Sequence, residues 1–198
     1  MFETDLVVHG AGRVPEIEAL NLAAAGVQVE KLGVRVNEFL QSVSNPAVYA
    51  AGDAAASGLP PLTPVAAYEG GIVASNLLKG NHRKVESIPV PSIVYTIPPL
   101  AAVGLPEQAA KQKGLQFRSN RQETSGWYSS RRVAEDCSGY KVLVGQDDQI
   151  LGAHLIGPHA EELINLFALA MQTKTPASKL RHAIFGYATL GSDVSYML

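Results

Sequence analysis

Gly52 and Asp53 are the first residues whose types and spacing could do binding chemistry. They follow the apolar run 47–51, so a carboxylate is expected at the end of a strand. The glycine beside it has no side chain and allows a ligand to approach the backbone closely. Such a carboxylate can accept hydrogen bonds from a bound ligand, or it can simply cap an ordinary loop.

A helix predicted over residues 63–79 offers a second kind of binding chemistry at its start. Thr63 is a good N-cap and Pro64 suits the first helical position. The first turn leaves N–H groups free, those of Val65 and Ala66 among them, and the positive end of the helix dipole favours a negatively charged ligand group. A plain capped helix with no ligand would have the same sequence.

The cysteine and histidine residues exclude several other kinds of site. Cys137 is the single cysteine, so the chain can form neither an internal disulfide nor a CxxC pair, which favours a reducing, cytoplasmic compartment. We interpret its thiol as structural or surface-exposed. The five histidines show neither HxxxH nor HExxH spacing, so no metal site is expected. Gly10-Ala11-Gly12 predicts a tight turn, because Pro15 stands where GxGxxG needs its third glycine.

Composition is typical of a globular protein. The 198 residues are 46% hydrophobic and 17% charged, which suits one large or two small domains and excludes intrinsic disorder. A net charge of −2 without a basic run argues against a nucleic-acid or anionic-membrane surface. Glu3 and Asp5 are unlike a signal peptide, and the most apolar helix, around 163–171, is shorter than the ~18 residues of a membrane span.

The first half of the sequence predicts short strands around the one long helix. The apolar run 6–8 predicts a buried strand within residues 4–13, and further strands are expected at 33–38 and 47–55. The polar stretch 81–87 precedes two prolines and indicates a domain boundary. We therefore divide the chain into residues 1–84 and 85–198.

The second half predicts an α+β fold, with helices packed on an antiparallel sheet. The clearest element is a hairpin from Tyr140 to Gly157. Further strands are expected at 92–96 and 115–118, and helices at 106–113, 161–173 and 177–185.

In their order along the chain, five motifs resemble the C-terminal part of the pyridine nucleotide-disulfide oxidoreductases. This flavoprotein family includes glutathione reductase, dihydrolipoamide dehydrogenase and mercuric reductase. The motifs are GAGRVP, VYAAGD, LTPVAAYEG, IVYTIPPLAAVGLPEQA and YKVLV…ILGAHLIG, and the resemblance covers essentially all 198 residues. It implies that residues 1–84 are the end of the NAD(P) domain with the returning segment of the FAD domain. Residues 85–198 would be the interface, or dimerisation, domain.

The resemblance also implies roles for the residues singled out above. Gly52 and Asp53 correspond to the family's second FAD motif, in which the carboxylate accepts a hydrogen bond from a ribityl hydroxyl. A helix N-terminus lies beneath the flavin pyrimidine in this family, where its dipole stabilises the negative charge gained on reduction. The matching residues here are Thr63, Pro64, Val65 and Ala66.

The C-terminal tail departs from the family pattern. Disulfide reductases of the family carry His-Pro-Thr-x-x-Glu, whose histidine acts as acid and base toward the partner subunit's dithiol. The matching stretch here is YATLGSD, with Tyr187 at the histidine's place and Ser192 at the glutamate's. A tyrosine, with a pKa near 10, is a poor base at neutral pH, which argues against glutathione reduction. Tyr187 would serve as a hydrogen-bond donor, as a ligand to a thiol-held soft metal ion as in mercuric reductase, or as an interface aromatic.

Two features of the second half predict a two-fold homodimer. The helix over 161–173 carries Ile164 and Leu169 outside its main apolar stripe. The tail over residues 185–198 is rich in aromatic and apolar residues, which is typical of an interface core. In the family that the chain resembles, the interface domains pair isologously.

Three family motifs have no counterpart in this chain: the glycine loop for the FAD pyrophosphate, the glycine loop for NAD(P), and the CxxxxC redox disulfide. We therefore expect a shortened piece, made deliberately or from a truncated reading frame, of an FAD- and NAD(P)H-dependent oxidoreductase in redox homeostasis. It would supply flavin contacts and the dimer interface, and by itself would bind no cofactor and be inert. A non-enzymatic homodimerisation module is the alternative. The electron acceptor and the choice between NADH and NADPH stay open.

Overall fold

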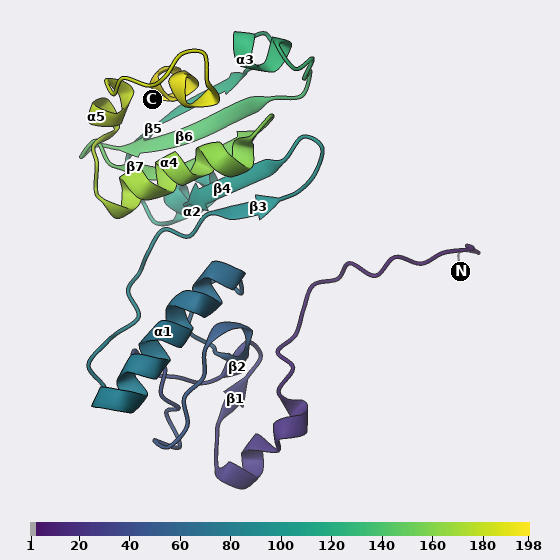
Figure 1. Ribbon diagram of the computed structural model, residues 1–198, viewed down its shortest axis with the longest axis vertical. Coiled ribbons are helices and arrows are strands. Elements are labelled where there is room, and N and C mark those ends of the chain that lie inside the picture. Colours follow the sequence, from purple (N-terminus) through teal and green to yellow (C-terminus); the bar gives the residue numbers. More distant parts are fainter. Residues whose placement is uncertain (1–2) are drawn as a thin grey trace. The chain divides into compact units, whose positions relative to one another are not determined.

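The computed structural model describes residues 3–198, which form two compact units (Figure 1). One unit extends to Ser87 and the other covers Ile88–Leu198. Residues 80–91, where the chain passes from one unit to the other, contain no helix or strand. Among residues 3–198, no helix has both the length and the apolar character that crossing a bilayer requires.

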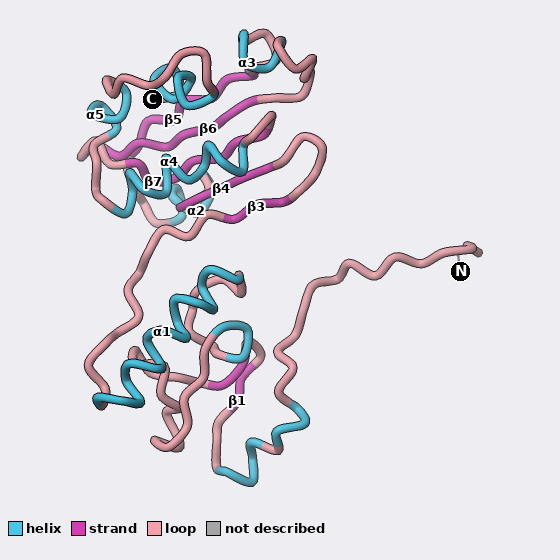
Figure 2. The backbone as a smooth tube through the Cα atoms, viewed as in Figure 1, coloured by secondary structure: helices cyan, strands magenta, loops and turns pink. Residues whose placement is uncertain are grey.

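The first unit contains one long helix and very little sheet (Figure 2). Its elements are η1 (Glu18–Leu20), η2 (Leu22–Ala25), β1 (Val29–Glu30), β2 (Gly33–Val34), η3 (Gly52–Ala54) and α1 (Thr63–Lys79). Strands β1 and β2 pair antiparallel over two residues each. A small apolar cluster of Ile17, Val27 and Val34 is the core beneath them.

The prediction of a buried strand at residues 6–8 is wrong. Leu6, Val7 and Val8 are 76%, 79% and 84% exposed, and no strand is assigned there. An apolar run becomes a buried strand only where a neighbouring strand pairs with it, and no other part of residues 3–198 does so. The strands expected at 33–38 and 47–55 are likewise reduced to β2 and isolated bridges.

Helix α1 confirms the helix predicted over residues 63–79, but its N-cap is not the one expected. Leu62 is extended (φ −125°, ψ 148°) and is the N-cap, so Thr63 opens the helix and is not its cap. The reason is that Thr63 already adopts helical backbone geometry, which an N-cap does not. The buried side chains of α1 recur at helical spacing and form one stripe: Val65, Glu69, Ile72 and Asn76.

The second unit confirms the predicted α+β fold. Its five-stranded antiparallel sheet has the order β3-β4-β7-β6-β5. The strands are β3 (Ser92–Val94), β4 (Leu100–Gly104), β5 (Phe117–Glu123), β6 (Gly139–Gly145) and β7 (Ile150–Ile156). The hairpin expected from Tyr140 to Gly157 is therefore β6–β7. Strand β4 was not predicted, because Pro98 and Pro99 end one strand and the next begins directly after them.

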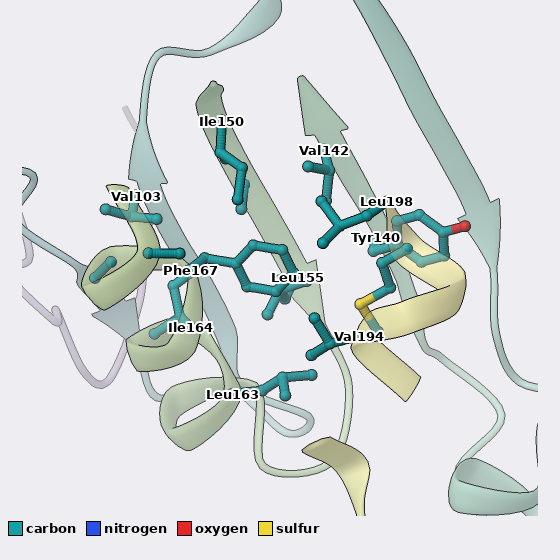
Figure 3. Packing of buried hydrophobic residues seen from close by; sticks show 14 of the residues in the cluster. Val103, Tyr140, Val142, Ile150, Leu155, Leu163, Ile164, Phe167, Val194 and Leu198 are labelled. Carbon is teal, nitrogen blue, oxygen red and sulfur yellow. The ribbon is translucent and has the colours of Figure 1, made fainter. Parts of the chain in front are cut away.

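Helix α4 packs against β4 and β7 and builds the core of the second unit. The helices here are α2 (Glu107–Gln112), α3 (Tyr128–Arg131), α4 (Ala160–Gln172), α5 (Ala177–Arg181), η4 (Leu190–Asp193) and α6 (Val194–Met197). Figure 3 shows Phe167 of α4 among strand residues, Leu155 among them, with Val194 from the C-terminal segment nearby. Phe167 is 0% exposed, as is Ile164.

Two expectations about this unit's apolar surface are therefore corrected. Ile164 does not face outward, because the buried face of α4 is wider than one stripe and also includes Leu163 and Ala168. Val194 and Leu198 are likewise buried in the core of their own chain, so the tail is only partly free for an interface. Leu169, by contrast, is 58% exposed. The helix expected over 177–185 ends at Arg181.

On the sheet face away from α4, a three-charge cluster joins α2 to β6. The Glu107 carboxylate lies 2.6 Å from Lys111 Nζ and 2.8 Å from Lys141 Nζ. Lys141 alternates along β6 with the core residues Tyr140 and Val142, so its side chain points to the opposite face. Hydrogen bonds from the two lysines, Lys111 first, lower the pKa of Glu107 from 4.5 to about 2.

This lowered pKa leads to a pH-dependent prediction. A carboxylate with a depressed folded-state pKa stabilises the fold above pH 4.5, and this stability is lost as the pH falls toward 2. We expect Glu107→Gln to lower the free energy of unfolding at pH 7, and the difference from the unsubstituted chain to shrink between pH 4.5 and pH 2. Urea unfolding followed by the fluorescence of Trp127, the single tryptophan, measures it.

Glu162→Gln is the matched control, because Glu162 makes no ion pair with any residue in the range 3–198. A difference between Glu107→Gln and the unsubstituted chain that stays constant with pH would contradict the assignment.

Candidate functional site

The Gly52–Asp53 turn lies against the first turns of α1. Gly52 has φ +62°, a backbone conformation that favours glycine. A Cβ atom placed on it would lie 2.8 Å from Cβ of Ala66, closer than two carbons can pack. Two segments singled out from the sequence are therefore brought together, and only a residue without a side chain fits between them.

A buried glutamate that sequence reasoning missed joins the same two segments. Glu69 is 0% exposed, and its Oε2 accepts a hydrogen bond from the Gly52 backbone N–H at 2.6 Å. Its other oxygen, Oε1, is buried and has no hydrogen-bond partner among the residues that the structure describes. The sequence did contain a signal, since Glu69 shares the helical spacing of the buried residues Val65 and Ile72.

Arg13 is a second residue that sequence reasoning missed. Its Nη1 lies 3.2 Å from Oδ2 of Asp53, and its Nη2 donates to the Pro61 carbonyl oxygen. The two side chains of the ion pair are 65% and 45% exposed, so the pair contributes at most about 1 kcal/mol to stability. Asp53 is therefore an accessible carboxylate with a guanidinium beside it.

The N-terminus of α1 has fewer free donors than the sequence suggested. The Ala66 N–H donates to the Leu62 carbonyl oxygen at 2.9 Å, so it is not free. Pro64 has no N–H, whereas Thr63 and Val65 lie in the first turn, where no intrahelical acceptor exists. No side chain caps this end of the helix. The donors left near Asp53 are those of Thr63 and Val65.

Tyr187 lies in the second unit and is 86% exposed. The segment around it is ordered by Thr189, whose Oγ1 donates to the Gly186 carbonyl oxygen at 2.6 Å and accepts the Ser192 N–H at 3.3 Å. Tyr187 borders a small hollow together with Asp193, whose pKa is raised by burial. The remaining candidate residues, Gly52, Asp53 and Thr63–Ala66, all belong to the first unit.

Comparison with known proteins decides the family. Residues 90–197 match the family model of the pyridine nucleotide-disulphide oxidoreductase dimerisation domain. Residues 1–70 match a second family model, that of the pyridine nucleotide-disulphide oxidoreductases. This chain belongs to the pyridine nucleotide-disulphide oxidoreductase family. The resemblance seen in the sequence is thereby confirmed.

Relatives of this chain differ greatly in length. It is 48% identical over 180 residues to an uncharacterized 19.7 kDa protein in a mercuric resistance operon of Staphylococcus aureus, covering 90% of this chain and 100% of that one. It is 38% identical to the mercuric reductase of Staphylococcus aureus, covering 98% of this chain but 35% of the reductase. The chain therefore spans about a third of that reductase.

The fold is shared with a solved flavoprotein disulfide reductase. The Cu(II) complex of the HOCl-induced reductase RclA from Escherichia coli matches with a TM-score of 0.84 and 24% identity, over 95% of this chain and 44% of RclA. At this identity the likeness establishes the fold of the chain and nothing finer.

The close contact at Gly52 gives a second prediction. We expect Gly52→Ala to destabilise the first unit by about 1–3 kcal/mol more than Gly58→Ala, because the new methyl group meets Ala66. Gly58 is the matched control, since it too has positive φ (+86°) but has no atom within 4 Å of an added Cβ. Amide exchange of the buried α1 residue Ile72 reports the stability. Equal losses in the two variants would show that the contact does not constrain the turn.

Proposed function

We propose that this chain is the C-terminal portion of an FAD- and NAD(P)H-dependent oxidoreductase, in which it supplies flavin contacts and the dimer interface. The observation that carries the proposal is the junction at Gly52. It holds an exposed carboxylate, that of Asp53, close to the uncapped N-terminus of α1. By itself the chain lacks the family's two glycine loops and redox cysteines, and we propose that it is inert.

The polar groups at this junction fit those of a flavin. Asp53 would accept a hydrogen bond from a ribityl hydroxyl, and Gly52 would let the chain of hydroxyls pass close to the backbone. The Val65 N–H and the positive end of α1 would favour the pyrimidine edge, which becomes negative on reduction, by about 0.3–1 kcal/mol. The flavin, when bound, supplies electron transfer from the nicotinamide to the acceptor, while these residues bind and orient it.

The dimer interface in this proposal lies within residues 85–198, the range that contains the second unit. The support is the matched dimerisation domain together with apolar side chains that the unit leaves exposed: Leu169, Ile184, Tyr187 and Tyr196. Tyr187 would act in the partner's site as a hydrogen-bond donor or a ligand to a thiol-held soft metal ion. The proposal includes a cytoplasmic location, supported by Cys137, an exposed thiol that can form no disulfide within the chain.

A non-enzymatic homodimerisation module is the second candidate. One observation favours it: the 19.7 kDa Staphylococcus aureus protein is matched along its full length. In that protein the same segment occurs without the rest of a reductase. In this reading residues 1–84 would have no flavin to contact.

Absorbance and a flavin titration test these proposals. We expect the purified chain to have no flavin absorption band after gel filtration and no NAD(P)H oxidation above the blank, because most of the cofactor site is missing. With FAD added in large excess, the contacts proposed here should still shift the backbone amide NMR signals of Asp53 and Val65. The shift should be lost in Asp53→Ala.

The outcomes separate the two candidates. A flavin band that survives gel filtration, or measurable NAD(P)H oxidation, contradicts the inert chain. Amide signals that do not move with FAD favour the homodimerisation module over a flavin-contacting segment.

A further inference from the structure

Two polar side chains lie fully buried on the inner stripe of α1, and they differ in how their hydrogen bonds are satisfied. Asn76, 1% exposed, uses every group that it has. Its Nδ2 donates to the carbonyl oxygens of Phe39 at 3.1 Å and Arg83 at 2.8 Å. Its Oδ1 accepts the N–H groups of His82 at 3.1 Å and Arg83 at 2.9 Å. Asn76 therefore fastens the segment after α1 to the helix.

Glu69, two helical turns before Asn76 on the same stripe, makes a single hydrogen bond. Its Oε2 accepts the Gly52 N–H at 2.6 Å, and its buried Oε1 has no partner in the part of the chain that the structure describes. No ion pair within residues 3–198 involves it. A buried polar atom without a partner is destabilising, so an apolar side chain of similar size would pack at lower cost. Packing therefore does not account for a glutamate at this position. The one hydrogen bond that its side chain makes is with the Gly52–Asp53 turn.

We propose that Glu69 is a positioning residue that holds the Gly52–Asp53 turn on the N-terminal turns of α1. Gly52 is held from two points of the helix, by the van der Waals surface of Ala66 and by the carboxyl group of Glu69. The Ala55 N–H closes the same turn by donating to the Gly52 carbonyl oxygen at 2.9 Å. Because Asp53 is the next residue, the Glu69 carboxyl determines where the exposed carboxylate lies relative to the helix N-terminus.

The functional meaning of this inference rests on the proposed flavin contact at Asp53, but the positioning itself does not. It can be read from the backbone amide of Gly52 without any flavin. A hydrogen bond as short as 2.6 Å shifts an amide proton downfield and slows its exchange with solvent. The Ile72 amide, in the middle of α1, reports the stability of the helix separately.

The experiment compares Glu69→Gln with Glu69→Leu by amide NMR of the full chain. Glutamine keeps a carbonyl acceptor, so the slow exchange of Gly52 should be retained. Leucine removes the acceptor, so Gly52 should exchange roughly tenfold faster, as expected for one lost hydrogen bond, while Ile72 changes much less. Asn76→Ala is the control for a merely structural role, because it should speed the exchange of Gly52 and Ile72 together.

Glu69→Asp provides an independent arm if the leucine variant does not fold. Its carboxyl is withdrawn by one methylene, so the Gly52 amide should lose its downfield shift and its protection. The proposal is overturned if neither Leu nor Asp alters the Gly52 amide, or if Gly52 and Ile72 change in proportion. Failure of FAD to move the Asp53 signal, with these results intact, would refute the flavin contact alone.

Discussion

The packing of Phe167 and Ile164 against β4 and β7 is the interaction on which the second unit depends. Both side chains are 0% exposed, and burying each contributes about 1.5–3 kcal/mol. Because α4 is held to the sheet by this face, Leu169 is left on the outer face. Val194 returns the chain end to the same core, so the tail segment that carries Tyr187 is anchored while the tyrosine itself stays exposed.

The first unit is held together in a different way. Its apolar cluster is small, and the candidate flavin contacts are positioned by a few specific contacts made by α1. Glu69 binds the Gly52 N–H, Ala66 leaves room only for a glycine, and Asn76 fastens the segment that follows the helix. The two units therefore differ in what they provide. The second unit provides an apolar core with an exposed surface, and the first unit provides a positioned carboxylate, that of Asp53.

The sequence predicted α1 from the residues at its start, α4 from its apolar spacing and the β6–β7 hairpin from two apolar runs around a polar turn, and its ordered motifs indicated the family. It failed where the outcome depends on a neighbour that local sequence does not reveal. The run at Leu6 is apolar but has no strand beside it, and Ile164 is buried in the core of the second unit although it lies outside the expected stripe. Glu69 was missed because a glutamate in an amphipathic helix is ordinarily solvated, and only the spacing of the buried stripe marks it as interior.

Sedimentation of the chain at micromolar concentration tests the central claim, that the second unit is a dimerisation domain. We expect a species of twice the 21.0 kDa chain mass. Leu169→Glu, a change on the outer face of α4, should yield the monomer. Leu77→Glu, at a leucine of similar exposure in the first unit (61% against 58%), should leave the dimer intact. A monomer in the unsubstituted chain, or the same dissociation in both variants, would contradict it.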